Sequence, residues 1–143
     1  RVLEYRDLVP ECVGMVQREV AIRIAEGPGS KEYGILSVLL QAWYDIEYLF
    51  TVSETVFSPP PKVKSAVIRL RRNATRRLAC DEALFVRVVK AAFGQRRKMI
   101  RNALRAAFGD FGGAEHPFFT RRAEQLSVAD FVALTNWVAE HRA

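Results

Sequence analysis

The sequence predicts an α/β segment followed by an all-helical unit, and three observations indicate this fold class. Residues 45–52 alternate apolar and polar side chains, and residues 65–72 are rich in β-branched side chains, as strands are. After Asn73 the apolar period changes from the two residues of a strand to the roughly 3.6 of an amphipathic helix. Between the two strands, Pro59-Pro60-Pro61 fixes the backbone and removes donors, so neither a helix nor a central strand fits there.

The first half of the chain alternates strand and helix patterns. A short apolar run suits a buried strand, and the glycines and proline of residues 27–30 break the helix that follows it. The two later strands can pair antiparallel. In order, the predicted elements are a strand at Cys12–Gln17, helices at about 18–26 and 35–43, and strands at Asp45–Val52 and Ser65–Arg72.

The second half predicts helices with recognisable ends. Asp81 is a good N-cap, and an apolar stripe from Phe85 to Phe93 ends at Gly94. The next helix, at about 97–108, places Met99, Ile100, Ala103, Leu104 and Ala107 on one side and Lys98, Arg101 and Arg105 on the other. After a loop at 109–117 we expect a short helix at 120–126. A final helix follows to about His141, starting at a capping box of Ser127 and Asp130.

The net charge of +6 is distributed unevenly along the chain. Between Lys62 and Arg105 there are 14 Lys and Arg residues and only two acids, whereas the remainder carries 8 basic and 14 acidic residues. Arginine outnumbers lysine 17 to 5, which favours recognition of phosphates and base edges over simple solubility. Charge separated this strongly predicts a polyanionic partner, RNA or DNA, and the alternative is a basic face that is only solvated.

No catalytic or metal-binding pattern occurs in the sequence: it has no Walker, HExxH or GxSxG motif. Cys12 and Cys80 lack metal-ligand spacing, so we expect two free thiols, which indicates a reducing compartment and a cytoplasmic location. His116 and His141 have no partner motif and are expected at the surface. No stretch approaches the roughly 18–20 apolar residues of a membrane span, so no membrane partner is expected. A start at Arg1 rather than Met is typical of a fragment or a processed chain.

The segment from Phe57 to Leu70 is the most informative part of the chain. Its prolines hold an aromatic ring on one side and Lys62 and Lys64 on the other, and a strand follows at once. Such a rigid loop is a plausible platform for a planar, anionic ligand such as a nucleotide. The alternative interpretation is a proline-rich linker between two domains.

Five motifs, in the right order, resemble those of the KsgA-type rRNA adenine N6-dimethyltransferases. The proline segment 57–70 is similar to the family signature Phe-x-Pro-Pro-Pro-Lys-Val-x-Ser-Ala-Val-Ile-Arg-Leu. The remaining four are the Met-x-Gln-Arg-Glu-Val-Ala run at 15–24, the Pro-Gly-x-x-x-Tyr-Gly-x-Leu-Ser run at 28–37, the Arg-Arg-Lys run at 93–104, and Arg-x-Glu-x-Leu-Ser at 122–127. The related Erm methyltransferases share the fold but have fewer prolines in this segment, so the housekeeping branch is favoured.

The resemblance implies a C-terminal portion of such an enzyme. The family's Gly-rich loop for S-adenosylmethionine, its acidic ribose ligand and its Asn-[Leu/Ile]-Pro-Tyr motif do not occur in this sequence. We therefore expect no catalytic, cofactor-binding or metal-binding residue here and no S-adenosylmethionine on this chain alone. The implied fold is an α/β remnant, the last strands of a Rossmann-like class I methyltransferase sheet, in residues 1–75. A small all-α RNA-binding domain would occupy residues 76–143.

The resemblance also implies roles for particular residues. Phe57, held by Pro59 and Pro60, matches the position that stacks on the extruded target adenine, although it could instead be a hydrophobic plug beneath the loop. The residues that match the family's grip on small-subunit rRNA are Arg96, Arg97, Lys98, Arg101 and Arg105, and Lys62 and Lys64 could extend this track or be structural.

Two hypotheses follow from the sequence. The first is part of a rRNA adenine dimethyltransferase that acts on the immature small ribosomal subunit. The second is a non-catalytic nucleic-acid-binding or ribosome-assembly module that shares this half. In either case the outer edge of the strand Cys12–Gln17 lacks its upstream neighbour. We expect that edge to pair with a second copy, to be covered by residues 1–10, or to lose its order.

Overall fold

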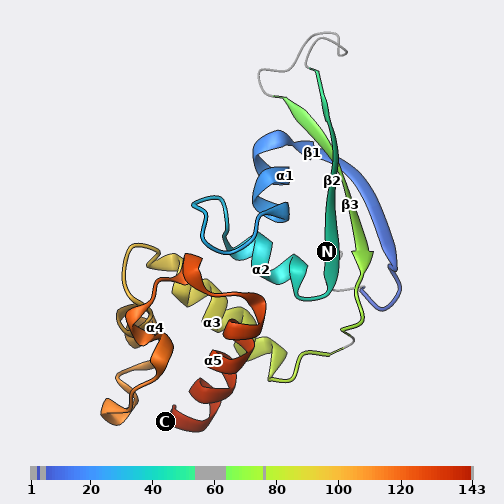
Figure 1. Ribbon diagram of the computed structural model, residues 1–143. Coiled ribbons are helices and arrows are strands. Elements are labelled where there is room, and N and C mark those ends of the chain that lie inside the picture. The colour runs from blue at the N-terminus through green and yellow to red at the C-terminus, as the bar shows by residue number, and fades with distance from the viewer. Residues whose placement is uncertain (1–2, 4–5, 54–63, 76, 143) are drawn as a thin grey trace.

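The fold was analysed in a computed structural model, which describes residues 3, 6–53, 64–75 and 77–142 (Figure 1). Its sheet has three strands in the order β1-β3-β2: β1 is Glu11–Gln17, β2 is Tyr44–Val52 and β3 is Ser65–Arg72. Both outer strands run antiparallel to β3, which confirms the pairing predicted for β2 and β3. A register shift interrupts β2 between Tyr48 and Phe50. The sheet is thus a small antiparallel unit with β3 at its centre.

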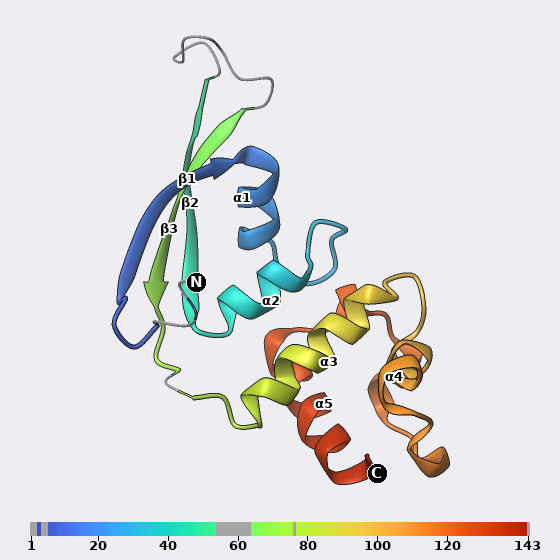
Figure 2. The same cartoon turned by 180° about the vertical axis from the view of Figure 1, so that it is seen from behind.

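Two helices cover one face of this sheet (Figures 1 and 2). They are α1, Arg18–Ala25, and α2, Ile35–Gln41, which ends two residues before the predicted limit. Every second residue of β3 points toward them and is buried, as a strand period of two requires. The buried β3 side chains are Ala66, Ile68 and Leu70.

The opposite face of the sheet is open, and this corrects the expectation that the first strand is buried. Val13 and Met15 on β1 are each 54% exposed, and Phe50 on β2 is 55% exposed. Among the described residues β1 pairs only with β3, so its outer edge carries no neighbouring strand. An apolar run predicts a buried strand, but the sequence does not specify which layers cover the two faces of that strand.

Three helices form a second unit, here called the helical unit, beside α2 (Figure 2). They are α3, Glu82–Gly94, α4, Ile100–Phe108, and α5, Val128–His141. Both predicted helix starts at Asp81 and Ser127 are confirmed, because Asp81 accepts from Leu84 N at 3.1 Å and Ser127 forms a capping box with Asp130. Three 3₁₀ turns complete the unit, at Phe111–Gly113, Pro117–Thr120 and Ala123–Gln125.

Two of these elements differ from the prediction for one shared reason. Residues 121 and 122 are extended, because Met99 bridges Arg122 and the amide of Ile100 donates to Arg121 O at 2.7 Å. The predicted helix at 120–126 is therefore two 3₁₀ turns, and the helix predicted from residue 97 starts only at Ile100. On α4, Ile100, Ala103 and Leu104 are buried as expected, whereas Ala107 is exposed, as is Met99 just before the helix.

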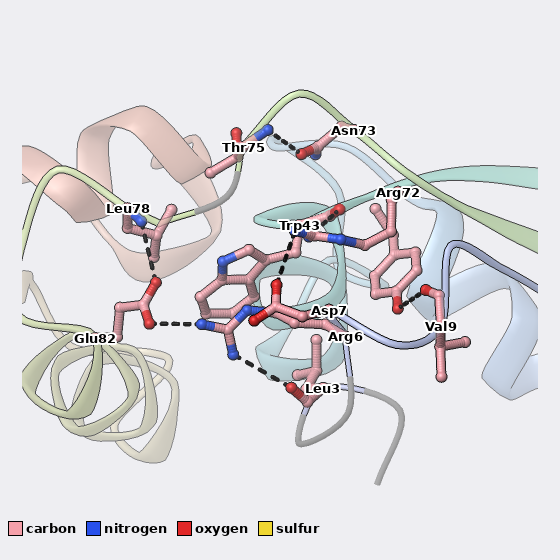
Figure 3. A network of polar contacts seen from close by, with 11 residues as sticks. Leu3, Arg6, Asp7, Val9, Trp43, Arg72, Asn73, Thr75, Leu78 and Glu82 are labelled. Atoms are coloured by element: carbon pink, nitrogen blue, oxygen red, sulfur yellow. Dashed lines mark hydrogen bonds and ion pairs between the residues drawn. The ribbon is translucent and has the colours of Figure 1, made fainter.

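The N-terminal segment fastens the sheet to the start of α3 (Figure 3). The Arg6 guanidinium lies 4.4 Å from the Trp43 ring centre, donates to Leu3 O at 3.2 Å and binds Glu82 Oε1 at 2.6 Å. Glu82 also accepts from Leu78 N at 3.0 Å, so one carboxylate fixes the connection that leads into α3. Buried residues of both units form one continuous cluster. None of the described helices is long and apolar enough to cross a membrane.

Candidate nucleic-acid interface

The basic side chains expected to bind RNA lie mostly on the turn between α3 and α4 and on α4 itself. Arg97 and Lys98 are exposed in a turn closed by Lys98 N donating to Gln95 O at 2.9 Å. Arg105 is exposed on α4. None of these three cations pairs with a carboxylate in the part of the chain that the structure describes. They are therefore free to meet phosphates.

Arg96 differs from its two neighbours because its guanidinium is held by the protein. Its Nη2 donates to Lys31 O at 2.6 Å and to Ser30 O at 3.2 Å, both on the loop between α1 and α2. The same group lies 3.5 Å from Glu124 Oε2 and 5.6 Å from the Phe93 ring centre. Arg96 thus joins the loop to the helical unit, and its side chain is only 34% exposed.

Two further contacts fix the same loop. The amide of Gly29 donates to Glu124 O at 2.7 Å, from a backbone with φ of 96° that glycine adopts without strain. Tyr33 is fully buried, and its ring meets Phe93 edge-on at 5.9 Å. Burial, and secondarily the charge of Asp130, raise the pKa of Tyr33 to about 12. Together, the contacts of Gly29, Tyr33, Arg96 and Glu124 attach the loop between α1 and α2 to the helical unit.

Arg101 is also engaged within the protein. Its Nη2 binds Glu115 Oε2 at 2.6 Å, and its guanidinium lies 6.0 Å from the Phe119 ring centre. The candidate basic residues therefore divide into free and engaged groups, a division that the helical wheel of α4 does not reveal. Arg97, Lys98 and Arg105 are free, whereas Arg96 and Arg101 are engaged.

Lys64 belongs to a different part of the surface. It is exposed just before β3, and its carbonyl accepts from Arg18 N at 2.9 Å, at the end of the sheet away from the helical unit (Figures 1 and 2). The structure therefore does not bring Lys64 beside the turn between α3 and α4. Lys62 and the base-stacking candidates Phe57, Pro59 and Pro60 lie outside the described residues.

Two cations on α3 were not among the predicted RNA-binding residues. Arg87 and Lys90 are exposed, and the Arg87 guanidinium lies 5.0 Å from the ring centre of Phe108 on α4. Their spacing of three residues, on the side of α3 opposite its apolar stripe, was the signal that could have found them. They add positive charge to the helical unit.

One of the two histidines departs from the expected surface position. His116 is half-buried and lies 5.6 Å from the Trp137 ring centre, and its Nδ1 accepts from Phe118 N at 3.0 Å. Burial, and secondarily the charge of His141, lower the pKa of His116. His141 is exposed as expected and stacks on Trp137 at 4.1 Å. Cys12 and Cys80 are free thiols, as predicted.

The chain is similar in sequence to known rRNA methyltransferases. A sequence model of the family described as ribosomal RNA adenine dimethylase matches residues 1–140. The ribosomal RNA small subunit methyltransferase A of Bacteroides thetaiotaomicron is 61% identical over 141 residues, which cover 98% of this chain and 53% of that protein. The protein of the same name from Cytophaga hutchinsonii is 58% identical over 139 residues, which cover 97% and 54% of the two chains.

Two solved structures resemble the fold. A dimethyladenosine transferase from Plasmodium falciparum superposes with a TM-score of 0.77 at 18% identity, covering 98% of this chain and 61% of that one. The 23S rRNA methyltransferase ErmE superposes with a TM-score of 0.54 at 21% identity, covering 89% and 55%. The chain thus spans about half the length of the curated relatives it matches.

Proposed function

Because the chain belongs to the ribosomal RNA adenine dimethylase family, we propose that it is the RNA-holding portion of a small-subunit rRNA adenine N6,N6-dimethyltransferase. The whole protein would transfer methyl groups from S-adenosylmethionine to two adjacent adenines in the immature small ribosomal subunit. The family match over residues 1–140 carries this proposal. We place the reaction in the cytoplasm, where ribosomal subunits mature.

The free cations Arg97, Lys98 and Arg105 would contact rRNA phosphates. Phosphate contacts position a protein on RNA and make its affinity depend on salt. Arg96 and Arg101, whose guanidinium groups already bind protein acceptors, would shape this surface more than they neutralise phosphates. Lys64, and Lys62 on the segment outside the described residues, would extend the contact toward the target base.

The proline segment would form one wall of the target-base pocket. A base inside a helix is inaccessible to a methyltransferase and must be extruded and stacked. Phe57, fixed by Pro59 and Pro60, would supply the stacking ring, a role that rests on the family motif alone. The three-stranded sheet would be the last part of a Rossmann-like sheet in residues 1–75, and residues 76–143 would form the RNA-binding domain.

Two of the described cavities suit S-adenosylmethionine poorly. One, of 630 Å³, is lined by Arg6, Arg72 and Arg77 with Asp7 as its single carboxylate, and the excess of positive charge disfavours a sulfonium cation. Another, 330 Å³, is lined by apolar side chains between β1 and α2 and offers the ribose no carboxylate. We propose that the cofactor binds in the part of the whole protein that lies outside this chain.

The outer edge of β1 is the candidate surface for self-association. In the described ranges no strand pairs with this edge, so a strand from a second copy or from the rest of the whole protein would fit there, beside the open face that carries Val13 and Met15. Sedimentation of this chain at increasing concentration would reveal pairing between copies.

A charge-reversal experiment tests the RNA surface. We expect the double variant Arg97→Glu/Lys98→Glu to bind small ribosomal subunits far more weakly and with a lower salt dependence, by about 0.7–0.9 in log–log slope per lost phosphate contact. The matched control is Arg77→Glu/Arg142→Glu, which changes the net charge equally at exposed positions that precede α3 and follow α5. Equal weakening in both double variants, or none in the first at physiological salt, would contradict the assigned surface.

A second experiment separates the enzyme from the assembly module. The whole protein that contains this chain should convert two adjacent adenines of unmethylated small subunits to dimethyladenine when S-adenosylmethionine is added, as detected by reverse-transcription stops. Tight subunit binding without methylation would favour the non-catalytic module.

A further inference from the structure

A cavity of 260 Å³ lies beside the C-terminal end of α4, and no residue of the turn between α3 and α4 lines it. The loop that follows α4 forms one wall, and Arg101 and Arg105 on α4 form the other. Two glycines of this loop, Gly109 and Gly113, have φ of 86° and 85°, so the loop can turn tightly around the opening. A Cβ at either glycine would meet nothing within 4 Å, because both face open space.

The apolar part of the cavity is aromatic. Phe111 and Phe119 both line it, with ring centres 6.2 Å apart, but Phe119 is only 2% exposed, so the half-buried Phe111 is the ring that a ligand could reach. Trp137 supports both from behind, with its ring centre 5.0 Å from each. Phe111 has φ of 56°, a backbone conformation that is costly for a residue with a side chain. The fold thus keeps an aromatic ring at this position despite a backbone that favours glycine.

The polar part of the cavity combines cations with acceptors. Arg105 is exposed and has no carboxylate partner among the described residues, whereas Arg101 binds Glu115 at 2.6 Å. Arg101 Nε is buried without a hydrogen-bond partner. The carboxylates of Asp110 and Glu115 each retain lone pairs beyond the Gly112 amide and the Arg101 guanidinium that they already accept from.

We propose that this cavity binds a single unpaired nucleotide of RNA, distinct from the target adenine. The base would stack on the Phe111 ring, the carboxylates would accept from its amino group, and Arg105 would bind the phosphate. Its volume is below the roughly 300–1,000 Å³ of typical cofactor sites, so it suits one base better than a whole cofactor. This inference rests on the proposed RNA binding and adds a contact to an unpaired nucleotide.

A site for phosphate alone would not need these features. Phosphates are bound by cations and backbone amides, as duplex RNA is through its phosphates and shape. Here the cavity carries two acidic side chains, which repel phosphate, and two aromatic rings, which phosphate does not use. Aromatic rings beside cations are the combination found where single-stranded nucleic acids bind.

The test compares two RNAs that have the same number of phosphates: a hairpin with a loop of unpaired adenosines, and a blunt duplex. We expect the unmodified chain to bind the hairpin about ten-fold more tightly at physiological salt, as stacking of one base contributes. Fluorescence of Trp137 should change with the hairpin only, because that ring touches both aromatic walls. Trp43 is buried in the sheet unit and supplies a constant background.

Three variants identify the cavity. Phe111→Leu should reduce the preference for the hairpin to near one and leave duplex affinity unchanged, whereas Phe118→Leu, the same change outside the cavity, should keep it. Arg105→Gln alters an exposed side chain that forms no ion pair in the described part of the chain, so it tests the cavity even if Phe111→Leu fails to fold. It should weaken hairpin binding more than duplex binding.

The outcomes separate this inference from the proposed function. Equal affinity of the unmodified chain for hairpin and duplex would refute the nucleotide cavity while leaving RNA binding intact. Equal effects of Phe111→Leu and Phe118→Leu on the hairpin preference would refute it too. Binding of neither RNA at physiological salt would refute the RNA-holding role itself and, with it, the inference.

Discussion

Replacing Arg96 with alanine should destabilise the chain. Its neighbours Arg97 and Lys98 are exposed, so the same replacement there should affect stability little. The variant loses hydrogen bonds to Lys31 O and Ser30 O, at 2.6 and 3.2 Å, and the ion pair with Glu124. Charged hydrogen bonds contribute about 1.5–3 kcal/mol when buried, and exposed ion pairs about 0–1 kcal/mol. Because about a third of each side chain is exposed, we expect a loss of about 2 kcal/mol in the free energy of unfolding.

Urea and thermal unfolding of the whole chain measure this loss. For a chain of 143 residues, about 2 kcal/mol corresponds to a Tm lower by roughly 6–8 °C. Arg96→Lys keeps the charge, but an ammonium lacks the planar fork that reaches both carbonyls, so it should recover only about half of the loss. Arg97→Ala is the matched control, because an exposed side chain without structural contacts should change stability by less than about 0.5 kcal/mol.

RNA binding should show the opposite difference between Arg96 and Arg97: the replacement of Arg97 should alter the salt dependence of the affinity, and that of Arg96 should not. Arg97→Ala should lower the log–log salt slope by about 0.7–0.9, the contribution of one phosphate contact, whereas Arg96→Ala should leave the slope unchanged. Two results would refute this reasoning: equal stability of the two alanine variants, or full recovery of stability by Arg96→Lys.

Two other predictions concern the helical unit. Asp81→Ala should cost about 1 kcal/mol in urea unfolding, because Asp81 caps α3 by accepting from Leu84 N, and Asp81→Asn should cost much less. Burial and His141 lower the pKa of His116 in the fold, so stability should be complete above about pH 6.5 and fall as the pH drops below that value toward the folded-state pKa. Protonation also removes the Nδ1 acceptor of Phe118 N, and His116→Asn, which keeps an acceptor but does not titrate, should flatten the pH profile of Tm between about pH 5 and 7.

Local patterns predicted the elements well wherever neighbouring residues decide them. The stripe from Phe85 to Ala92 is buried on α3, and the helix starts at Asp81 and Ser127 are where their caps predict. Capping and periodicity act within a turn or two of chain, so they are legible in sequence. The start of α4 could not be predicted in this way, because it depends on Met99 pairing with Arg122, 23 positions later in the chain.

The candidate interface shows the same limit. The sequence does not distinguish the consecutive cations Arg96, Arg97 and Lys98 as phosphate ligands. In the fold, the loop between α1 and α2 binds Arg96 and leaves the other two free. Arg101 and Arg105 share one side of α4, but Glu115 reaches only the first. The stacking role of Phe57 stays a prediction, since that segment lies outside the described residues.

Sequence alone was sufficient for the succession of an α/β segment and a helical unit, for the concentration of positive charge and for the family, because composition, periodicity and motifs are properties of the chain itself. Tertiary structure decided which face of the sheet is covered, which cations are free and where a cavity opens. Those properties depend on segments distant in sequence that meet in space, as Gly29 meets Glu124 and Phe111 meets Trp137. The physical reason is that burial and hydrogen bonding are set by neighbours in space, and the order of residues does not specify these directly.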